Sequence, residues 1–192
     1  MIRLGLTGGI GMGKSTVSAL FAAHDIPSFN ADAEVHRLQA PHGPAIPALA
    51  AAFPDLVNAG VLNRPGLRAL VLQDAGKMRI LEQIMHPLVR TARAEFLTGM
   101  QTKKAILFDI PLLFETKAQA EFDRIIVVSC PRELQIARVM QRGLQRAEVE
   151  ALIAKQMPDA QKREGADFII ENGGTIEATK AQVQAVIKEL GL

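Results

Sequence analysis

The chain has no tryptophan, no tyrosine and a single cysteine among its 192 residues, and its aromatic side chains are eight phenylalanines. Proteins that bind single-stranded nucleic acid usually present aromatic platforms along a basic groove, so this composition predicts no nucleic-acid partner. The one cysteine, Cys130, excludes an intrachain disulfide and favours a reducing cytoplasm. Because Cys130 follows an apolar run and has no CxxC partner, we expect it to be inert core.

Long apolar runs are lacking as well. No stretch approaches the length of a membrane-spanning helix, and the first residues lack the basic-then-apolar layout of a signal peptide. We therefore expect a soluble cytoplasmic protein without a membrane partner. The net charge is only +2, a mild basic excess that suits a pocket for the phosphates of small molecules. The length and the 48% hydrophobic content allow one domain with a real core and a small insertion, and they leave the oligomeric state open.

The most informative segment is a glycine-rich loop near the N-terminus. A short apolar strand, Ile2–Leu6, runs directly into Gly8-x-x-x-x-Gly13-Lys14-Ser15, and an amphipathic helix follows. This spacing is typical of a phosphate-binding loop, because glycines let successive backbone N–H groups converge on an anion at a helix N-terminus. Lys14 would reach the terminal phosphates, and the Ser15 hydroxyl would bind magnesium. The residues expected to contact the donor nucleotide are Gly9, Gly11, Met12, Gly13, Lys14, Ser15 and Thr16.

Short segments that are apolar on both faces alternate with helical patterns, which predicts a parallel sheet in a doubly wound α/β fold. The expected strands are Ile2–Leu6, Ile26–Phe29, Ala105–Ile110, Arg124–Ser129 and Phe168–Ile170. The expected helices are Lys14–Ala23, Asp32–Leu38, Arg64–Leu72, Lys77–Gly99, Pro131–Gln141, Ala147–Gln156 and Thr175–Leu190. Pro87 should kink the fourth helix or begin a new one. The proline-rich segment from Pro41 to Pro65 suggests a loop-linked insertion on the substrate side.

Three acidic residues follow expected strands, where open α/β sheets bind their ligands. Asp32 would accept or orient a hydroxyl proton of a phosphoryl acceptor; the alternative is that Asp32, or Asn30 before it, only caps the next helix. Asp109 is placed either to contact magnesium or to accept backbone hydrogen bonds at its strand end. Glu115 is a weaker candidate for the magnesium shell and would otherwise pair with an arginine.

A basic helix face lies in the second half of the chain. Arg138 and Arg142 are four residues apart, so both side chains lie on one face and can bind a transferring phosphoryl group. Gly143 would provide the hinge of a mobile lid. The alternative, a solvated basic surface, holds better for the cations that follow, Lys155, Lys162 and Arg163. His86, beside Pro87, is more typical of a packing or hydrogen-bonding histidine than of a metal ligand.

Taken in order, these residues resemble the dephospho-coenzyme A kinase family over essentially the whole chain. The resemblance rests on Thr7–Thr16, Ala31-Asp32, Leu62-Asn63-Arg64 with Arg68, Leu81-Glu82, Ile84–Val89, Pro111–Glu115, Arg138 and Arg142, Gln156-Met157-Pro158, Lys162-Arg163, Ala166-Asp167 and Asn172-Gly173. The glycine loop alone fits many NTPases, whereas the ordered set behind it is far more specific. Two positions depart from the usual family pattern: Asn30 replaces an aspartate, and Leu152 replaces an arginine.

The resemblance implies transfer of the γ-phosphate of ATP, with magnesium, to the ribose 3′-hydroxyl of dephospho-CoA. It implies one three-layer P-loop kinase unit over residues 1–192, with a five-stranded parallel sheet. The core would span about 1–40 and 101–192, a helical substrate-binding insertion about 41–100, and a lid about 138–160. By this resemblance Asp32 would be the base, and Lys14, Arg138 and Arg142 would take part in catalysis. Asn172 and Gly173 would lie near the adenine of ATP. The residues on the acceptor side would be Arg64, His86, Pro111, Leu112, Leu113 and Phe114.

Two other functional interpretations use the same glycine loop. A nucleoside or nucleotide monophosphate kinase would share the loop, the base and the arginines, but it would need only a compact acceptor pocket. A GTP-dependent switch would need an Asn-Lys-x-Asp run for guanine, which the chain lacks. A Rossmann dinucleotide site is excluded because Lys14 or Thr16 stands where its third glycine is required.

Overall fold

The computed structural model describes residues 1–192 and divides the chain into two compact units. The first unit comprises residues 1–29 and 101–192, and the second comprises residues 30–100. The sequence suggested an insertion that begins near residue 41, whereas the second unit begins at Asn30. The earlier start follows from helix α2 (Ala31–Leu38), which packs against α5 (Ala75–Gly99) of the same unit.

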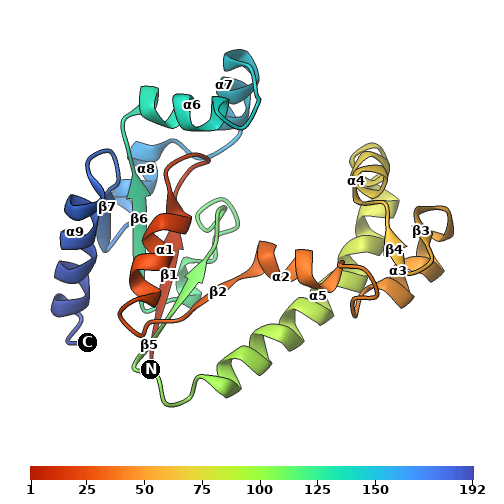
Figure 1. Cartoon of the computed structure of the whole chain (residues 1–192), viewed down its shortest axis with the longest axis horizontal. Helices are drawn as coiled ribbons and strands as arrows, with labels where there is room; N and C mark the ends of the chain where they lie inside the picture. The colour runs from red at the N-terminus through yellow and green to blue at the C-terminus, as the bar shows by residue number, and fades with distance from the viewer. The chain divides into compact units, whose positions relative to one another are not determined.

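The first unit is built on a five-stranded sheet (Figure 1), which confirms the predicted parallel α/β fold. Its strands, in spatial order, are β2 (Ser28–Asn30), β5 (Ala105–Asp109), β1 (Ile2–Thr7), β6 (Arg124–Ser129) and β7 (Phe168–Glu171). Strand β1 lies at the centre and pairs in parallel with β5 and β6, with Leu6 opposite Asp109. The carboxyl ends of β1 and β5 therefore lie side by side, and the chain enters the glycine loop from there.

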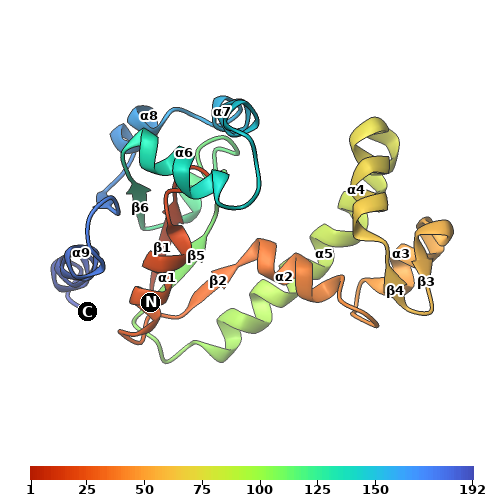
Figure 2. The ribbon, with the colours of Figure 1, turned by 45° about the horizontal axis from the view of Figure 1, so that its top comes forward.

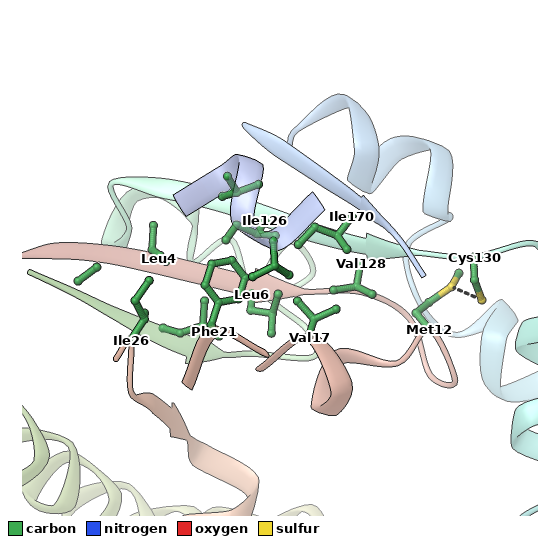
Figure 3. Close-up of a cluster of buried hydrophobic side chains, with 14 residues drawn as sticks. Leu4, Leu6, Met12, Val17, Phe21, Ile26, Ile126, Val128, Cys130 and Ile170 are labelled. Carbon is green, nitrogen blue, oxygen red and sulfur yellow. Dashed lines mark hydrogen bonds between the residues drawn. The ribbon is translucent and has the colours of Figure 1, made fainter. Parts of the chain in front are cut away.

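Helices α1 (Lys14–Ala22) and α9 (Ile176–Glu189) contact each other and cover one face of this sheet. Figure 3 shows the resulting core, in which Val17 and Phe21 of α1 pack against Leu4 and Leu6 of β1. Alternation along the strands sends neighbouring residues to the opposite face. On that face a second cluster forms from Leu113, Phe114, Ile125 and Val127. Both faces of the sheet are thus buried, as the apolar strands predicted.

The remaining helices of the first unit are α6 (Arg132–Met140), α7 (Arg146–Ala154) and α8 (Asp159–Glu164), with a 3-10 turn at Gln119–Glu121. Figures 1 and 2 show α6 and α7 beyond the carboxyl ends of β1 and β6, at the same end as the glycine loop. Gly143, between α6 and α7, has φ +92, and a Cβ added there would meet no atom within 4 Å. The α8 helix was not expected from the sequence.

The second unit contains α2, α3 (Ile46–Ala52), a 3-10 turn (Pro54–Leu56), the strands β3 (Val57–Asn58) and β4 (Val61–Leu62), α4 (Arg64–Gln73) and α5. The segment expected to be loop-linked thus forms a helix and an antiparallel hairpin. The two-residue turn of this hairpin has positive φ at both Ala59 and Gly60, as a type I′ turn requires. An apolar cluster that includes Leu38, Leu49 and Met85 forms the core of this unit.

Helix α5 runs unbroken from Ala75 to Gly99 with Pro87 inside it. Of the two outcomes expected at Pro87, a kink or a new helix, the new helix was therefore wrong. Proline removes one helical hydrogen bond, but α5 packs against α2, α3 and α4, and such tertiary contacts outweigh local propensity. The helix also begins earlier than predicted, because the Asp74 side chain accepts from the backbone N–H groups of Gly76 and Lys77. No helix of the structure is both long enough and apolar enough to cross a membrane.

Candidate active site

The glycine loop adopts a conformation that side chains would obstruct. Gly13 has φ +93, and a Cβ there would lie 2.0 Å from Asn172 Nδ2. Gly8 has φ +152, and a Cβ there would lie 2.5 Å from the carbonyl oxygen of Val128. Helix α1 begins directly after Gly13, has no side-chain cap and carries no acidic residue in its first turn. The positive dipole end of α1 is thus neither capped by a side chain nor offset by an acidic residue, and it favours an anion.

Lys14, Ser15 and Thr16 open this helix. The Lys14 ammonium donates to the carbonyl oxygen of Gly8 at 3.3 Å, so its side chain folds back over the loop. Ser15 and Thr16 are exposed. A lysine above the loop and a hydroxyl at the helix start are the arrangement that a P-loop uses for the β- and γ-phosphates.

Arg138 and Asn172 hold the loop from outside. Asn172 is 6% exposed, and its Nδ2 donates to the carbonyl oxygen of Met12 at 2.9 Å, while Thr179 Oγ1 donates to its Oδ1 at 3.2 Å. The Arg138 guanidinium donates to the Asn172 carbonyl oxygen at 2.9 Å and, at 3.5 Å, to that of Met12. Both residues therefore brace the loop backbone in this structure.

A cavity of about 450 Å³ lies beside the loop. It is lined by Gly11, Gly13, Ser15, Thr16, Arg138, Gln141, Arg142, Asn172, Gly174 and Ile176. The first unit thus brings the loop together with both predicted arginines and with Asn172. Gly174 rather than Gly173 lines this cavity, because Gly173 packs against Pro131.

Asp109 lies at the end of β5, opposite Leu6, and is 6% exposed. The next residue of β1, Thr7, is fully buried, and its hydroxyl donates to the Pro111 carbonyl oxygen at 3.3 Å. Magnesium prefers oxygen ligands and is commonly held by one or two protein groups together with substrate phosphates. A hydroxyl at Ser15 and a carboxylate on the strand beside β1 fit this ligand chemistry.

Glu115 pairs with a lysine, not with the arginine that the sequence suggested. Lys162 Nζ lies 2.9 Å from Glu115 Oε1, and the Met157 N–H donates to the same oxygen at 2.8 Å. Lys162 is fully buried, so its assignment to a solvated basic surface was wrong. Burial opposes ionisation of Glu115, but hydrogen bonds from Lys162 and Met157 outweigh it and keep the pKa of this carboxyl below its ordinary value.

Only part of the Pro111–Phe114 segment is exposed at the surface. Leu113 and Phe114 are 0% and 6% exposed and belong to the core beneath the sheet, whereas Leu112 is 44% exposed. Cys130 is buried and free, as expected, and its Sγ lies 3.4 Å from Met12 Sδ (Figure 3). Burial raises the pKa of the Cys130 thiol, which makes it a poor nucleophile.

The second unit holds Asp32, Arg64 and His86. Asn30 Oδ1 accepts from the Ala33 N–H at 2.8 Å, so Asn30 caps α2 and Asp32 is an exposed residue of its first turn. Of the two caps that the sequence allowed, Asn30 is the one used. Arg64 Nη1 lies 2.7 Å from His36 Nδ1. Because an arginine can only donate, this contact requires His36 Nδ1 to be the acceptor and to carry no proton.

Two cavities of about 480 Å³ each lie in the second unit and share Gln39 and Leu81. The first is lined by His36, Gln39, Arg64, Pro65, Leu67, Arg68, Val71, Met78 and Leu81. The second is lined by Val35, Gln39, Leu81, Glu82, Met85, His86, Val89 and Arg90. Arg64 and His86 thus line two neighbouring cavities, the first with Arg68 and the second with Glu82 and Arg90 beside apolar side chains.

Sequence reasoning assigned no role to two glutamines that contact the loop, although Gln156 is part of the Gln156-Met157-Pro158 run that carries the resemblance. Gln135 Nε2 donates to the Ile10 carbonyl oxygen at 2.8 Å, and Gln156 Oε1 accepts from the Ile10 N–H at 2.9 Å. Gln135 is the only polar member among the buried residues of α6, which include Ile136 and Val139. A polar residue on an apolar helix face was the available signal for Gln135.

A glycine loop between a central parallel strand and a helix, with two arginines at the same cavity, defines a P-loop kinase. The family model for dephospho-CoA kinase matches residues 2–178, so the chain belongs to the dephospho-CoA kinase family. A relative named dephospho-CoA kinase from Mesorhizobium japonicum is 46% identical over 99% of this chain and 97% of its own.

Two solved structures are similar over nearly their whole length. The crystal structure of TT1252 from Thermus thermophilus has a TM-score of 0.85 and 36% identity, and covers 98% of this chain and 97% of its own. Dephospho-CoA kinase from Campylobacter jejuni has a TM-score of 0.67 and 25% identity, and covers 98% of this chain and 96% of its own. The resemblance read from the sequence motifs is thereby confirmed.

Proposed function

We propose that this protein transfers the γ-phosphate of ATP to the ribose 3′-hydroxyl of dephospho-CoA, which gives coenzyme A and ADP. The observation that carries the proposal is the cavity at the glycine loop, where the start of α1 meets Arg138, Arg142 and Asn172. This cavity offers the loop backbone, the Ser15 hydroxyl and two guanidinium groups to a polyphosphate, and Lys14 belongs to the same loop. Membership of the family supplies the identity of the acceptor.

On the donor side, the N–H groups at the start of α1 bind the phosphates, and Lys14 turns from the Gly8 carbonyl toward the γ-phosphate. Magnesium, when bound, supplies charge neutralisation between the phosphates, and Ser15 and Asp109 would hold it. Arg142 and Arg138 offset the charge that spreads over the transferring phosphoryl group. The segment of about 138–160 would act as the lid, with Gly143 as its hinge.

On the acceptor side, Asp32 orients the 3′-hydroxyl and takes its proton. The Asn30 cap supports this role, because it leaves the Asp32 carboxylate uncommitted in the first turn of α2. Arg64, held by His36, would bind an anionic group of the acceptor, and His86 would contact its neutral portion. Of the Pro111–Phe114 segment, the exposed Leu112 is the side chain best suited to touch substrate.

The cofactors of this proposal are ATP and magnesium, and the partner is the small molecule dephospho-CoA. The single cysteine is free and buried, which suits a reducing compartment, so we place the reaction in the cytoplasm.

The test is ADP release by the purified protein with magnesium and ATP, compared between dephospho-CoA, adenosine, AMP and CMP. We expect turnover with dephospho-CoA and a product with a new phosphate at the ribose 3′ position, identified by ³¹P NMR and mass spectrometry. Turnover with a simple nucleoside or nucleotide and none with dephospho-CoA would instead assign the protein to the monophosphate kinases.

A further inference from the structure

Ile10 stands at the tip of the glycine loop, and side chains from outside the loop hold both of its backbone polar groups. Its N–H donates to Gln156 Oε1 at 2.9 Å, and its carbonyl oxygen accepts from Gln135 Nε2 at 2.8 Å. Gln135 comes from α6, and Gln156 comes from the turn that follows α7. The two glutamines therefore hold one loop residue between them, and neither belongs to the glycine motif.

The flanking residues explain why this tip needs external support. Gly9 and Gly11 lie on either side of Ile10, and Gly11 has φ +78. The Met12 N–H donates to the Gly9 carbonyl oxygen at 3.2 Å within the loop, but a glycine-flanked peptide has more conformational freedom to lose than any other, so contacts from outside add to its order. A Cβ at Gly9 would lie 3.1 Å from Gln135 Nε2 and 3.3 Å from Gln156 Oε1, which shows how closely both amides pack on the loop.

The turn that carries Gln156 is itself held in place. The next residue, Met157, donates its N–H to Glu115 Oε1, and that carboxylate pairs with the fully buried Lys162. On the other side, the Gln156 N–H donates to the Ile153 carbonyl oxygen in the last turn of α7. The position of Gln156 thus depends on both α7 and the Glu115–Lys162 pair.

We propose that Gln156 is a positioning residue for the donor nucleotide, with Gln135 as its counterpart on the other side of Ile10. Its side-chain carbonyl fixes the Gly9–Gly11 part of the loop before the phosphates arrive, so that the loop N–H groups need no reorganisation on binding. Because Gln156 lies two residues beyond the end of α7, it also links the position of α7 to the shape of the loop. The effect on turnover rests on the proposed function, whereas the effect on nucleotide binding does not.

The test compares Gln156→Met, which keeps the length of the side chain and removes the acceptor, with Gln161→Met. Gln161 is an exposed glutamine of α8 and serves as the matched control. Amide hydrogen exchange at Ile10, the Kd of ADP by calorimetry, and kcat and KM for each substrate are measured. For Gln156→Met we expect faster amide exchange at Ile10. We also expect the Kd of ADP and the KM for ATP to rise about tenfold, because the loss of one hydrogen bond changes a binding constant by about that factor. The KM for dephospho-CoA and the Tm without nucleotide stay close to the wild-type values.

A second variant, Gln156→Glu, retains an acceptor oxygen and is expected to restore protection of the Ile10 amide. Wild-type ADP affinity in Gln156→Met, despite faster exchange at Ile10, would overturn the proposal. An equal rise in both KM values together with a large fall in Tm would also overturn it, because it would assign Gln156 a merely structural role. Weakened ADP binding in Gln156→Met, in a protein that does not phosphorylate dephospho-CoA, would support the positioning role and reject the proposed function.

Discussion

The Lys162 ammonium lies 2.9 Å from Glu115 Oε1, and only 1% of the lysine side chain is exposed. A buried ammonium without a counter-charge is strongly destabilising, whereas a paired one is tolerated. The same carboxylate accepts the Met157 N–H, so it joins the turn after β5 to the turn after α7. This pair therefore supports the polar contacts that reach the glycine loop from outside.

Glu115→Gln should lower the free energy of unfolding by about 3 kcal/mol, because it leaves the buried Lys162 charge without its partner. Urea denaturation followed by circular dichroism measures the change. The double variant Glu115→Gln with Lys162→Met should recover part of the loss, since it removes both charges. Glu133→Gln, which breaks an exposed pair with Arg146, is the control and should leave the unfolding midpoint unchanged. A double variant that is less stable than Glu115→Gln would contradict the ion-pair explanation.

The stabilisation from Glu115 should depend on pH. Burial disfavours the charged carboxylate, but its hydrogen bonds with Lys162 and Met157 lower its pKa in the folded protein from the ordinary value of 4.5. The unfolded chain therefore binds this proton more readily, so the contribution is complete above pH 4.5 and is lost as the pH falls through the lowered pKa. The difference in unfolding free energy between wild type and Glu115→Gln should shrink as the pH falls from 4.5 through the lowered pKa. A constant difference over that range would show that Glu115 stabilises the fold without its charge.

The sequence predicted the sheet well, because its strands are buried on both faces and their apolar runs are bounded by polar residues. Arg124–Ser129 matches its strand at both ends. The hairpin in the second unit could not be predicted in this way, since its strands have two residues each and Ala59 is an unusual residue for positive φ. Helix α5 continues through Pro87 because of contacts with three other helices, which a local pattern does not contain.

The same limit applies to the site. The glycine loop is contiguous, so its residues could be assigned from spacing alone. Lys162 and Glu115 are distant in the sequence and form a pair only through the fold, so their partnership had no local signal. Gln156 and Ile10 are 146 positions apart. Contacts that hold a site in shape come from distant segments, whereas the groups that bind the ligand can be close in sequence.

Gly13→Ala should abolish nucleotide binding. The substitution places a Cβ at φ +93 and 2.0 Å from Asn172 Nδ2, so either the loop or Asn172 must move away from the Met12 carbonyl. Calorimetric titration with ADP measures the loss. The matched control is Gly99→Ala, at the end of α5, where a Cβ meets nothing within 4 Å. ADP binding by Gly13→Ala at wild-type affinity would show that the Asn172 contact is not needed for the shape of the loop.

Asp32→Asn should lower kcat by about two to four orders of magnitude, the range typical for removal of a general base. The asparagine has the size of the aspartate and can still orient a hydroxyl, but it cannot take a proton. ADP binding should be unchanged, since the residues at the loop cavity belong to the other unit. Asp55→Asn, an exposed carboxylate of the same unit, serves as the control and should keep wild-type kcat. If Asp32→Asn turns over at the wild-type rate, Asp32 is not the base. Its exposed position in the first turn of α2 then serves no catalytic role.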